Sequence, residues 1–178
     1  MSRINADDVC ALPPALLALD LSITATGIAF PDGSTATLRP VTKGDDRLDE
    51  IATVIGDTAV NIDLVVIEGP VVRSNAAVTI GMVHGAVRRE LIRRGRSYVE
   101  VPPATLKKYA TGKGNASKPD MRMALYQRAG LDIDDDNQVD AWWLRAAALD
   151  AAGHAPFAMP KAQRDALDKV HWPWGVAE

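Results

Sequence analysis

The chain has 178 residues, 47% of them hydrophobic and 24% charged, and this composition is typical of one globular domain with a sizeable core. Its single cysteine, Cys10, excludes an internal disulfide framework and a zinc site built from several thiolates. No apolar run reaches membrane-spanning length, and residues 1–11 lack the basic and then apolar layout of a signal peptide, so we expect no membrane contact and a cytoplasmic location.

The predicted elements alternate between strands and helices along the chain. Apolar runs bounded by turn residues predict strands at residues 15–20, 26–30, 35–39, 63–68 and 98–101, with the turn Pro31-Asp32-Gly33 joining the second to the third. Helical spacing of apolar residues predicts helices at residues 45–60, 74–94, 104–110, 118–129 and 137–152, and a small terminal helix at 160–170. Ser74 is a suitable N-cap for the second helix, and Gly95 ends it.

Two acids close apolar strands, and a third lies in a helix that should pack on the sheet. Asp20 follows the run Leu16–Leu19, Glu68 follows Leu64–Ile67, and Asp140 lies just inside the helix at 137–152. A buried carboxylate is costly unless it is paired, hydrogen-bonded or bound to a metal. The right-handed crossover rule places the strand at 63–68 parallel to the first strand, with both acids at carboxyl ends, where α/β sheets present their sites.

This acid set predicts a divalent metal site. Adjacent strands lie about 4.8 Å apart, and two ions about 3.5–4 Å apart would fit between such carboxylates, one activating water and one stabilising the leaving oxygen. Hard oxygen ligands without a histidine or cysteine cluster favour Mg²⁺ or Mn²⁺ over zinc.

The net charge of −3 hides an uneven distribution of charge. The segment from Arg88 to Arg128 holds eleven lysines and arginines and three acids, so it carries +8 and the rest of the chain −11. A solvated helix face is the alternative explanation for any single charged run. Because basic residues cluster in two different elements, the pattern favours a polyanionic partner. The candidate residues for binding such a partner, which would include DNA, are Lys107, Lys108, Lys113, Lys118, Arg88, Arg89 and Arg93.

Four ordered motifs resemble those of the RuvC-like Holliday junction resolvases, a phage and bacterial family of the ribonuclease-H-like superfamily. The motifs are ALDLSITATGIA, LVVIEGP, VPPATLKKYATGKGNASKPDM and NQVDAWWLRAAAL, and together they extend over residues 16–152. Four motifs in the right order are far more specific than any one of them.

The resemblance implies an α/β ribonuclease-H-like fold, in which a mixed five-stranded sheet of order 3-2-1-4-5 carries helices on both faces. Residues 12–153 would form the nuclease domain, 1–11 a flexible N-terminus and 154–178 an extension with a short helix. The family is homodimeric and Mg²⁺-dependent, and it cuts branched DNA to leave 5′-phosphates. Asp20, Glu68 and Asp140 match its metal-binding acids, and Lys107 or Lys108, with Lys118, match residues that face the DNA backbone.

The sequence departs from the family pattern at two positions. The family places a fourth acid or a histidine three residues before the last aspartate, and here that residue is Asn137. Asp136 is an alternative ligand if the helix begins early enough to bring it onto the face of Asp140. An aromatic residue usually follows the second acid by three positions, and here it is Val71, so base stacking at a junction centre should be weaker.

Two other functions and one structural alternative stay open. The chain could recognise branched DNA or assist recombination with little or no cleavage. A sugar-kinase or actin-type ATPase is suggested by DLSITATG, but those proteins duplicate the domain and 178 residues leave no room for a second copy. In the helix at 74–94, the small residues Ala77, Gly81 and Gly85 form a stripe suited either to packing on the sheet or to a two-fold interface.

Overall fold

The structure is a computed structural model, and it describes residues 12–70 and 76–174. Its strands are β1 (Leu16–Asp20), β2 (Thr26–Ala29), β3 (Thr35–Leu38), β4 (Leu64–Glu68) and β5 (Tyr98–Val101). Its helices are α1 (Asp46–Thr58), α2 (Ala77–Arg93), α3 (Pro103–Thr111), α4 (Lys118–Ala129), α5 (Asp136–Ala151) and α6 (Lys161–Arg164), followed by a 3-10 turn, η2 (Leu167–Lys169). No helix in the described part of the chain is both long and apolar enough to cross a membrane.

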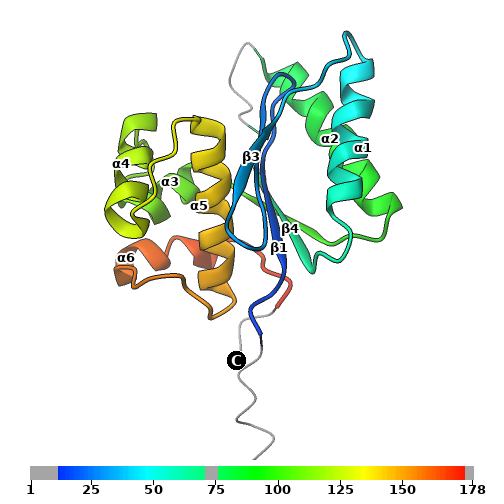
Figure 1. Ribbon diagram of the computed structural model, residues 1–178. Coiled ribbons are helices and arrows are strands. Elements are labelled where there is room, and N and C mark those ends of the chain that lie inside the picture. The colour runs from blue at the N-terminus through cyan, green and yellow to red at the C-terminus, as the bar shows by residue number, and fades with distance from the viewer. Residues whose placement is uncertain (1–11, 71–75, 175–178) are drawn as a thin grey trace, which may run out of the picture.

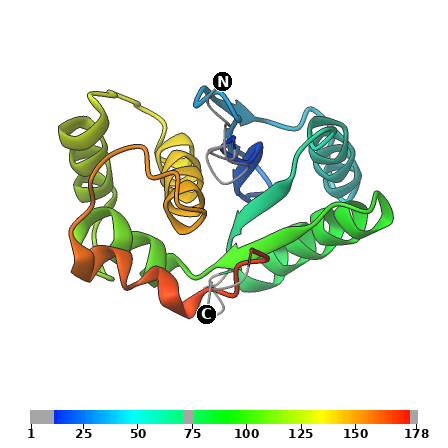
Figure 2. The ribbon, with the colours of Figure 1, turned by 90° about the horizontal axis from the view of Figure 1, so that it is seen from below.

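The five strands form one mixed sheet of order β3-β2-β1-β4-β5, which confirms the predicted α/β fold and strand order. The strands β1, β4 and β5 are parallel to one another, whereas β2 and β3 are antiparallel hairpin partners on the other side of β1. Figure 1 shows α1 and α2 on one face of the sheet and α3 to α6 on the other, and the view from below in Figure 2 shows the same two layers.

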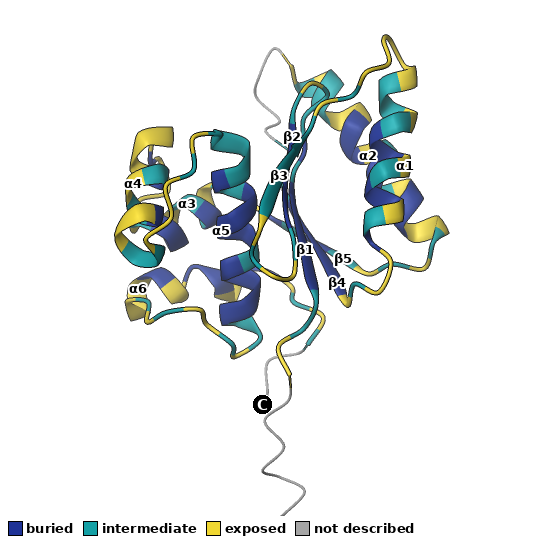
Figure 3. Cartoon of the chain, viewed as in Figure 1, coloured by how far each residue is buried: buried dark blue, intermediate teal, exposed yellow. Residues whose placement is uncertain are grey.

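The central strands are buried because both of their faces are covered by helices. Leu16–Leu19 of β1 and Val65–Ile67 of β4 have no exposed surface. Figure 3 colours most of β1 and β4 as buried. Such continuous apolar runs are expected of strands that lie between two helical layers. Alternate side chains therefore enter two separate cores, with Leu16 and Ala18 in the core under α5 and Leu17 and Leu19 in the core under α1 and α2.

Helix α5 is the most buried helix, with ten buried residues among its sixteen. At its centre Trp143 is fully buried, and its indole N–H donates a hydrogen bond to the carbonyl of Met121 at 3.2 Å. The rings of Trp142, Phe157 and Tyr109 lie around it, with centroids 5.6–6.0 Å from that of Trp143. This packing fixes α5 against the sheet and so fixes the position of Asp140.

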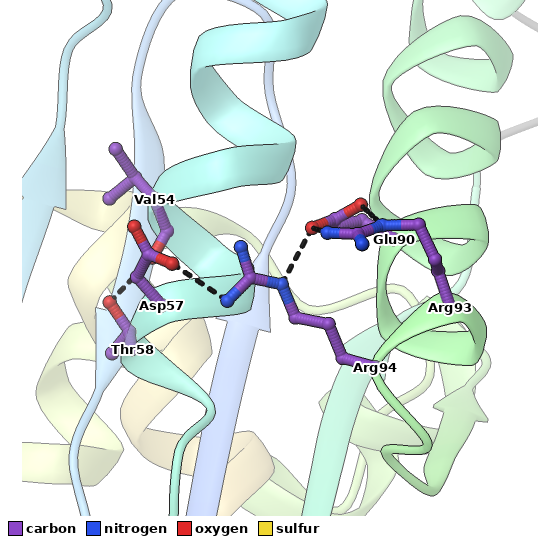
Figure 4. A network of polar contacts seen from close by, with 6 residues as sticks. All are labelled: Val54, Asp57, Thr58, Glu90, Arg93 and Arg94. Atoms are coloured by element: carbon purple, nitrogen blue, oxygen red, sulfur yellow. Dashed lines mark hydrogen bonds and ion pairs between the residues drawn. The ribbon is translucent and has the colours of Figure 1, made fainter.

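An ionic network joins α1 to α2 on the opposite face (Figure 4). Arg93 and Arg94 both donate to the carboxylate of Glu90, with the shortest N–O distances at 2.6 Å, and Arg94 also donates to Asp57 of α1 at 2.7 Å. Hydrogen bonds from these two arginines lower the pKa of Glu90 to about 2. Gly56 makes room for Arg94, because a Cβ at residue 56 would lie 2.5 Å from the Arg94 Nε.

Most predicted boundaries lie within two residues of the observed ones, and three differences have a physical reason or a larger size. The proposed cap Ser74 lies outside the described residues, and α2 begins at Ala77 without a side-chain cap. Helix α5 begins at Asp136 instead of 137, because Asp135 caps it. The predicted helix at 160–170 is wrong as a single element: a hydrogen bond from the N–H of Ala166 to the carbonyl of Gln163 tightens the backbone after α6, and η2 follows as a separate turn.

Candidate metal centre

Three carboxylates meet at the carboxyl end of the two central parallel strands. Asp20 is the last residue of β1, Glu68 is the last residue of β4, and Asp140 lies in the second turn of α5. One carboxylate oxygen from each residue lies within 4.8 Å of the other two. The structure thus brings together the three acids that were predicted from the sequence. Their roles in metal binding and catalysis stay predictions.

The pleat of the two strands aims both carboxylates at α5. Side chains alternate between the faces of a strand, so Asp20 shares its face with Leu16 and Ala18, which lie in the core under α5. Glu68 shares its face with Leu64 and Val66 of the same core. Because β1 and β4 are parallel neighbours in register, their last residues end at the same edge of the sheet.

Gly27 allows the first turn of α5 to come close to this edge. It pairs with Asp20 across the β1–β2 ladder. A Cβ at residue 27 would lie 2.0 Å from the backbone oxygen of Asn137 and 2.3 Å from its carbonyl carbon. Only a residue without a side chain fits there, and Asp140 reaches Asp20 because α5 begins in contact with β2.

Side chains on β3 hold the same end of α5 in place. The N-cap Asp135 accepts hydrogen bonds from the Asn137 N–H at 3.0 Å and from the Thr37 hydroxyl at 2.7 Å. Gln138 donates to the Thr37 hydroxyl at 2.8 Å and accepts from that of Thr35 at 2.7 Å. These positioning residues were not predicted from the sequence, since nothing local distinguishes the cap within the run Asp134–Asp136, and the contact of Gly27 joins residues far apart in the chain.

We expect Gly27→Ala to lower the free energy of unfolding by about 1–3 kcal/mol, the usual cost of forcing extra volume into a packed site. It should also slow any metal-dependent reaction, because α5 and Asp140 must move away from the sheet. Urea unfolding followed by circular dichroism measures the first effect. The control is Gln127→Ala, at an exposed residue of α4, which should change stability by no more than about 0.5 kcal/mol. Equal effects from the two changes would contradict the close contact.

The environment of the three acids disfavours their charged forms. Burial raises the pKa of Asp20, and burial together with the charges of Asp20 and Asp140 raises the pKa of Glu68. Burial, with the charge of Asp20, raises the pKa of Asp140 to about 7. Like charges this close cannot all ionise without a counter-charge, so at neutral pH the cluster is suited to bind a cation.

The donor set fits a hard divalent cation. Magnesium and manganese are bound through carboxylate oxygens, commonly with few protein ligands and with waters or substrate oxygens completing the shell. Asp20, Glu68 and Asp140 supply three such carboxylates from two strands and a helix that the core holds rigid. In the described residues this is the only cluster of three or more acids, histidines or cysteines with this spacing.

Two of the predicted DNA-facing lysines lie close enough to act on the cluster. The charge of Lys118 offsets part of the rise in the pKa of Asp20 and Asp140, and the charge of Lys107 offsets part of the rise in the pKa of Glu68 and Asp140. Lys108 and Lys113 are exposed at the end of α3 and in the loop after it. The four lysines thus lie on the α5 side of the sheet, the same side as the acids.

The predicted arginines lie on the opposite side of the sheet. Arg88, Arg89 and Arg93 belong to α2, which covers the other face (Figure 2). Arg88 contacts Glu100 at 3.4 Å and Arg93 contacts Glu90 at 2.6 Å, so part of the positive charge of this helix is already paired.

The two candidates for a fourth ligand are both in the first turn of α5. Asp136 forms an ion pair with Lys118 at 3.1 Å, and its charge adds to the rise in the pKa of Asp140. Asn137 directs its backbone oxygen at Gly27.

Comparison with solved structures identifies the fold. The chain is similar to RuvC of Thermus thermophilus, with 18% identity and a TM-score of 0.62 over 82% of this chain and 99% of that one. The T. thermophilus RuvC structure in complex with a Holliday junction substrate matches with the same identity, TM-score and coverage. No family model and no curated protein matches the sequence. The predicted resemblance to RuvC-like resolvases is therefore confirmed at the level of the fold.

Proposed function

We propose that the chain is a metal-dependent endonuclease that cuts branched DNA of the Holliday junction type. The observation that carries the proposal is the meeting of Asp20, Glu68 and Asp140 within 4.8 Å at the carboxyl ends of β1 and β4. The RuvC-like fold supports it, because one of the matching T. thermophilus structures holds a Holliday junction. Such an enzyme would act in the cytoplasm of a bacterium or of a phage-infected host.

The three acids are proposed to hold Mg²⁺ or Mn²⁺, with two ions in each active site. Bound in this way, the ions would polarise a phosphodiester and lower the pKa of an attacking water. The protein's own contribution is rigid placement, because Asp20 and Glu68 end two fully covered strands and Asp140 is fixed by the packing of α5. Lys107 and Lys118 supply positive charge beside the acids, where the scissile phosphate would lie.

Substitutions in the first turn of α5 should identify the fourth ligand. If Asp136 completes the site, Asp136→Ala should slow cleavage strongly, whereas Asn137→Ala should do so if its amide oxygen coordinates. Since Asp136 also pairs with Lys118, Asp136→Asn is the comparison, because it removes the charge from that ion pair and keeps a side-chain oxygen that can coordinate a metal. Single-turnover cleavage rates over a range of Mn²⁺ concentrations measure the effect. Small and equal effects from both changes would indicate three protein ligands completed by water.

The lysine group at 107, 108, 113 and 118 is proposed to contact DNA phosphates. Replacing all four residues with alanine should weaken binding to every branched substrate. Each phosphate contact that is lost reduces the number of counterions released from the DNA on binding, and this release favours binding. The slope of log K against log salt should fall by about 3.6, at about 0.9 for each contact. Branch preference should survive, since phosphate contacts position the DNA without specifying it.

Fluorescence anisotropy with labelled junction, flap and duplex DNA at several salt concentrations measures these slopes. The control is Lys161→Ala with Lys169→Ala, which removes exposed lysines from the C-terminal extension and should leave the slope unchanged. Unchanged binding by the quadruple variant would move the DNA surface to Arg88, Arg89 and Arg93 on α2, which stay proposed as a further contact.

A homodimer is also proposed, formed through α2. Gly81 and Gly85 are exposed, and a Cβ at either position would meet no atom, so these glycines do not pack on the sheet. Val78 and Met82 beside them are 78% and 43% exposed. A second copy would bury this face. Sedimentation velocity should give a dimer for the natural chain and a monomer for Met82→Arg, and a monomer in both cases would contradict the dimer.

A further inference from the structure

A groove of about 620 Å³ lies beside the metal centre, between α4 and the segment that leads into α5. The segment runs back along α4. Arg122, in the second turn of the helix, contacts Asp132 at 3.0 Å and also contacts Asp134, while Lys118, in the first turn, contacts Asp136 at 3.1 Å. These ion pairs link the two walls of the groove.

The surface of α4 inside the groove is apolar and exposed. Pro119, Met123 and Tyr126 recur at helical spacing on one face, and Met123 and Tyr126 are 55% and 58% exposed. The opposite face of α4 already anchors the helix through Met121 and Leu125, which are 1% and 0% exposed. The exposed stripe is therefore not needed to hold α4 in the fold, and it is available for contact with a partner.

The groove begins at the catalytic end of the molecule. Lys118 lines it and also acts electrostatically on Asp20 and Asp140. Tyr126 lies eight residues further along the helix, about 12 Å away at 1.5 Å per residue. A DNA strand whose phosphate lies at the acids would therefore have a neighbouring nucleotide within reach of Tyr126.

The charges of the groove select a base over a phosphate. Arg122 contacts Asp132 and Asp134, and Lys118 contacts Asp136 at the end nearest the metal centre, so the groove beyond Lys118 has little free positive charge for an anion. A nucleobase is uncharged and planar, and its face can stack on an exposed aromatic ring. The thioether of Met123 suits the edge of such a ring. The lysines at 107, 108 and 113 would meanwhile hold the backbone of the same strand.

We propose that this groove binds an unpaired base of the branched DNA, stacked on Tyr126 and bordered by Met123. The inference rests on the proposed endonuclease function and adds to it a site that recognises an unpaired nucleotide next to the cleavage position. Fully paired duplex offers no free base face, so the groove would favour substrates in which pairing is interrupted near the cut.

The test compares Tyr126→Ala, Tyr126→Phe and Met123→Ala with the natural chain. The affinity of each protein is measured for two DNAs, a junction with one unpaired nucleotide near the branch and a fully paired duplex. The measurement is made in EDTA so that no DNA is cut. Tyr126→Ala should weaken binding to the unpaired substrate at least about fivefold, the lower end of the range for one base–aromatic stack. Tyr126→Phe should bind within about twofold of the natural chain, and duplex binding should not change.

Two controls separate the possible outcomes. Val60→Ala, at an exposed apolar residue beyond α1, and Gln127→Ala, on α4 outside the groove, should leave all affinities unchanged. An equal loss on both DNAs, or no loss on either, would overturn the inference while leaving the endonuclease proposal intact, provided that the natural chain cuts branched DNA. A change of oligomeric state in Tyr126→Ala without selective loss would also overturn it and assign the groove to a second copy of the chain.

Discussion

Replacing any one of the three converging acids by its amide should lower the rate of DNA cleavage at least about 100-fold. Each of Asp20→Asn, Glu68→Gln and Asp140→Asn removes one charged ligand from a cluster whose oxygens lie within 4.8 Å of one another. A bound metal is worth several kcal/mol of transition-state stabilisation, and each 1.36 kcal/mol is a factor of ten in rate. DNA binding should persist, because the lysine group at 107, 108, 113 and 118 is unchanged.

Single-turnover cleavage of a labelled four-way junction measures this loss, and gel shift in EDTA measures binding. Asp168→Asn, an exposed acid of η2 in the C-terminal extension, is the control and should cut at the natural rate. A triad variant that cuts at close to the natural rate would show that the site has been assigned wrongly.

The same changes should stabilise the metal-free protein near neutral pH. Burial makes the charged forms of Asp20, Glu68 and Asp140 unfavourable, so an uncharged amide in place of one of them relieves both desolvation and repulsion. We expect Asp140→Asn to raise the melting temperature in EDTA at pH 8 by several degrees, since 1 kcal/mol corresponds to about 2–4 °C in a domain of this size. Saturating Mn²⁺ should raise the melting temperature of the natural chain more than that of the variant.

The pH dependence has a defined sign. The pKa of Asp140 is raised from 3.8 to about 7 in the folded state, so the folded state binds this proton more tightly than the unfolded chain. Its contribution to stability is fully present below about pH 4 and is lost as the pH rises through about 7. Thermal unfolding in EDTA between pH 4.5 and 8 should therefore show a steeper loss of stability for the natural chain than for Asp140→Asn. Parallel curves would contradict the burial of this charge.

The features that the sequence predicts correctly are those that a short local pattern determines. Asp20 and Glu68 each end an apolar run, and this local pattern alone marks them as strand-end acids. The crossover rule then makes the two strands parallel, and the structure places them as neighbours. Asp140 directly precedes a helical run rich in alanine and tryptophan, as expected of a helix buried on the sheet.

The remainder depends on contacts between distant residues. Gly27 resembles any strand glycine in the sequence, because its close contact is with Asn137, far along the chain. Asp135 differs from the neighbouring aspartates through its contacts with Thr37 of β3 and with Arg39, which directly follows that strand. The count of charged residues in the sequence overstated the free positive charge around α2. Arg94, directly after this helix, pairs with Glu90 of α2 and with Asp57 of α1. The groove at Tyr126 was also missed, since exposure on α4 is decided by the packing of Met121 and Leu125.

The most direct test of the endonuclease proposal is one cleavage gel. Labelled four-way junction, flap, fork and duplex DNA are incubated with the natural chain and with Asp140→Asn, in Mg²⁺, in Mn²⁺ and in EDTA. We expect the natural chain to cut the branched substrates in either metal and to cut nothing in EDTA, with 5′-phosphate products, and Asp140→Asn to cut nothing under any condition. Tight binding of branched DNA by the natural chain without cleavage in either metal would contradict the proposal and assign the molecule to recognition of branched DNA alone.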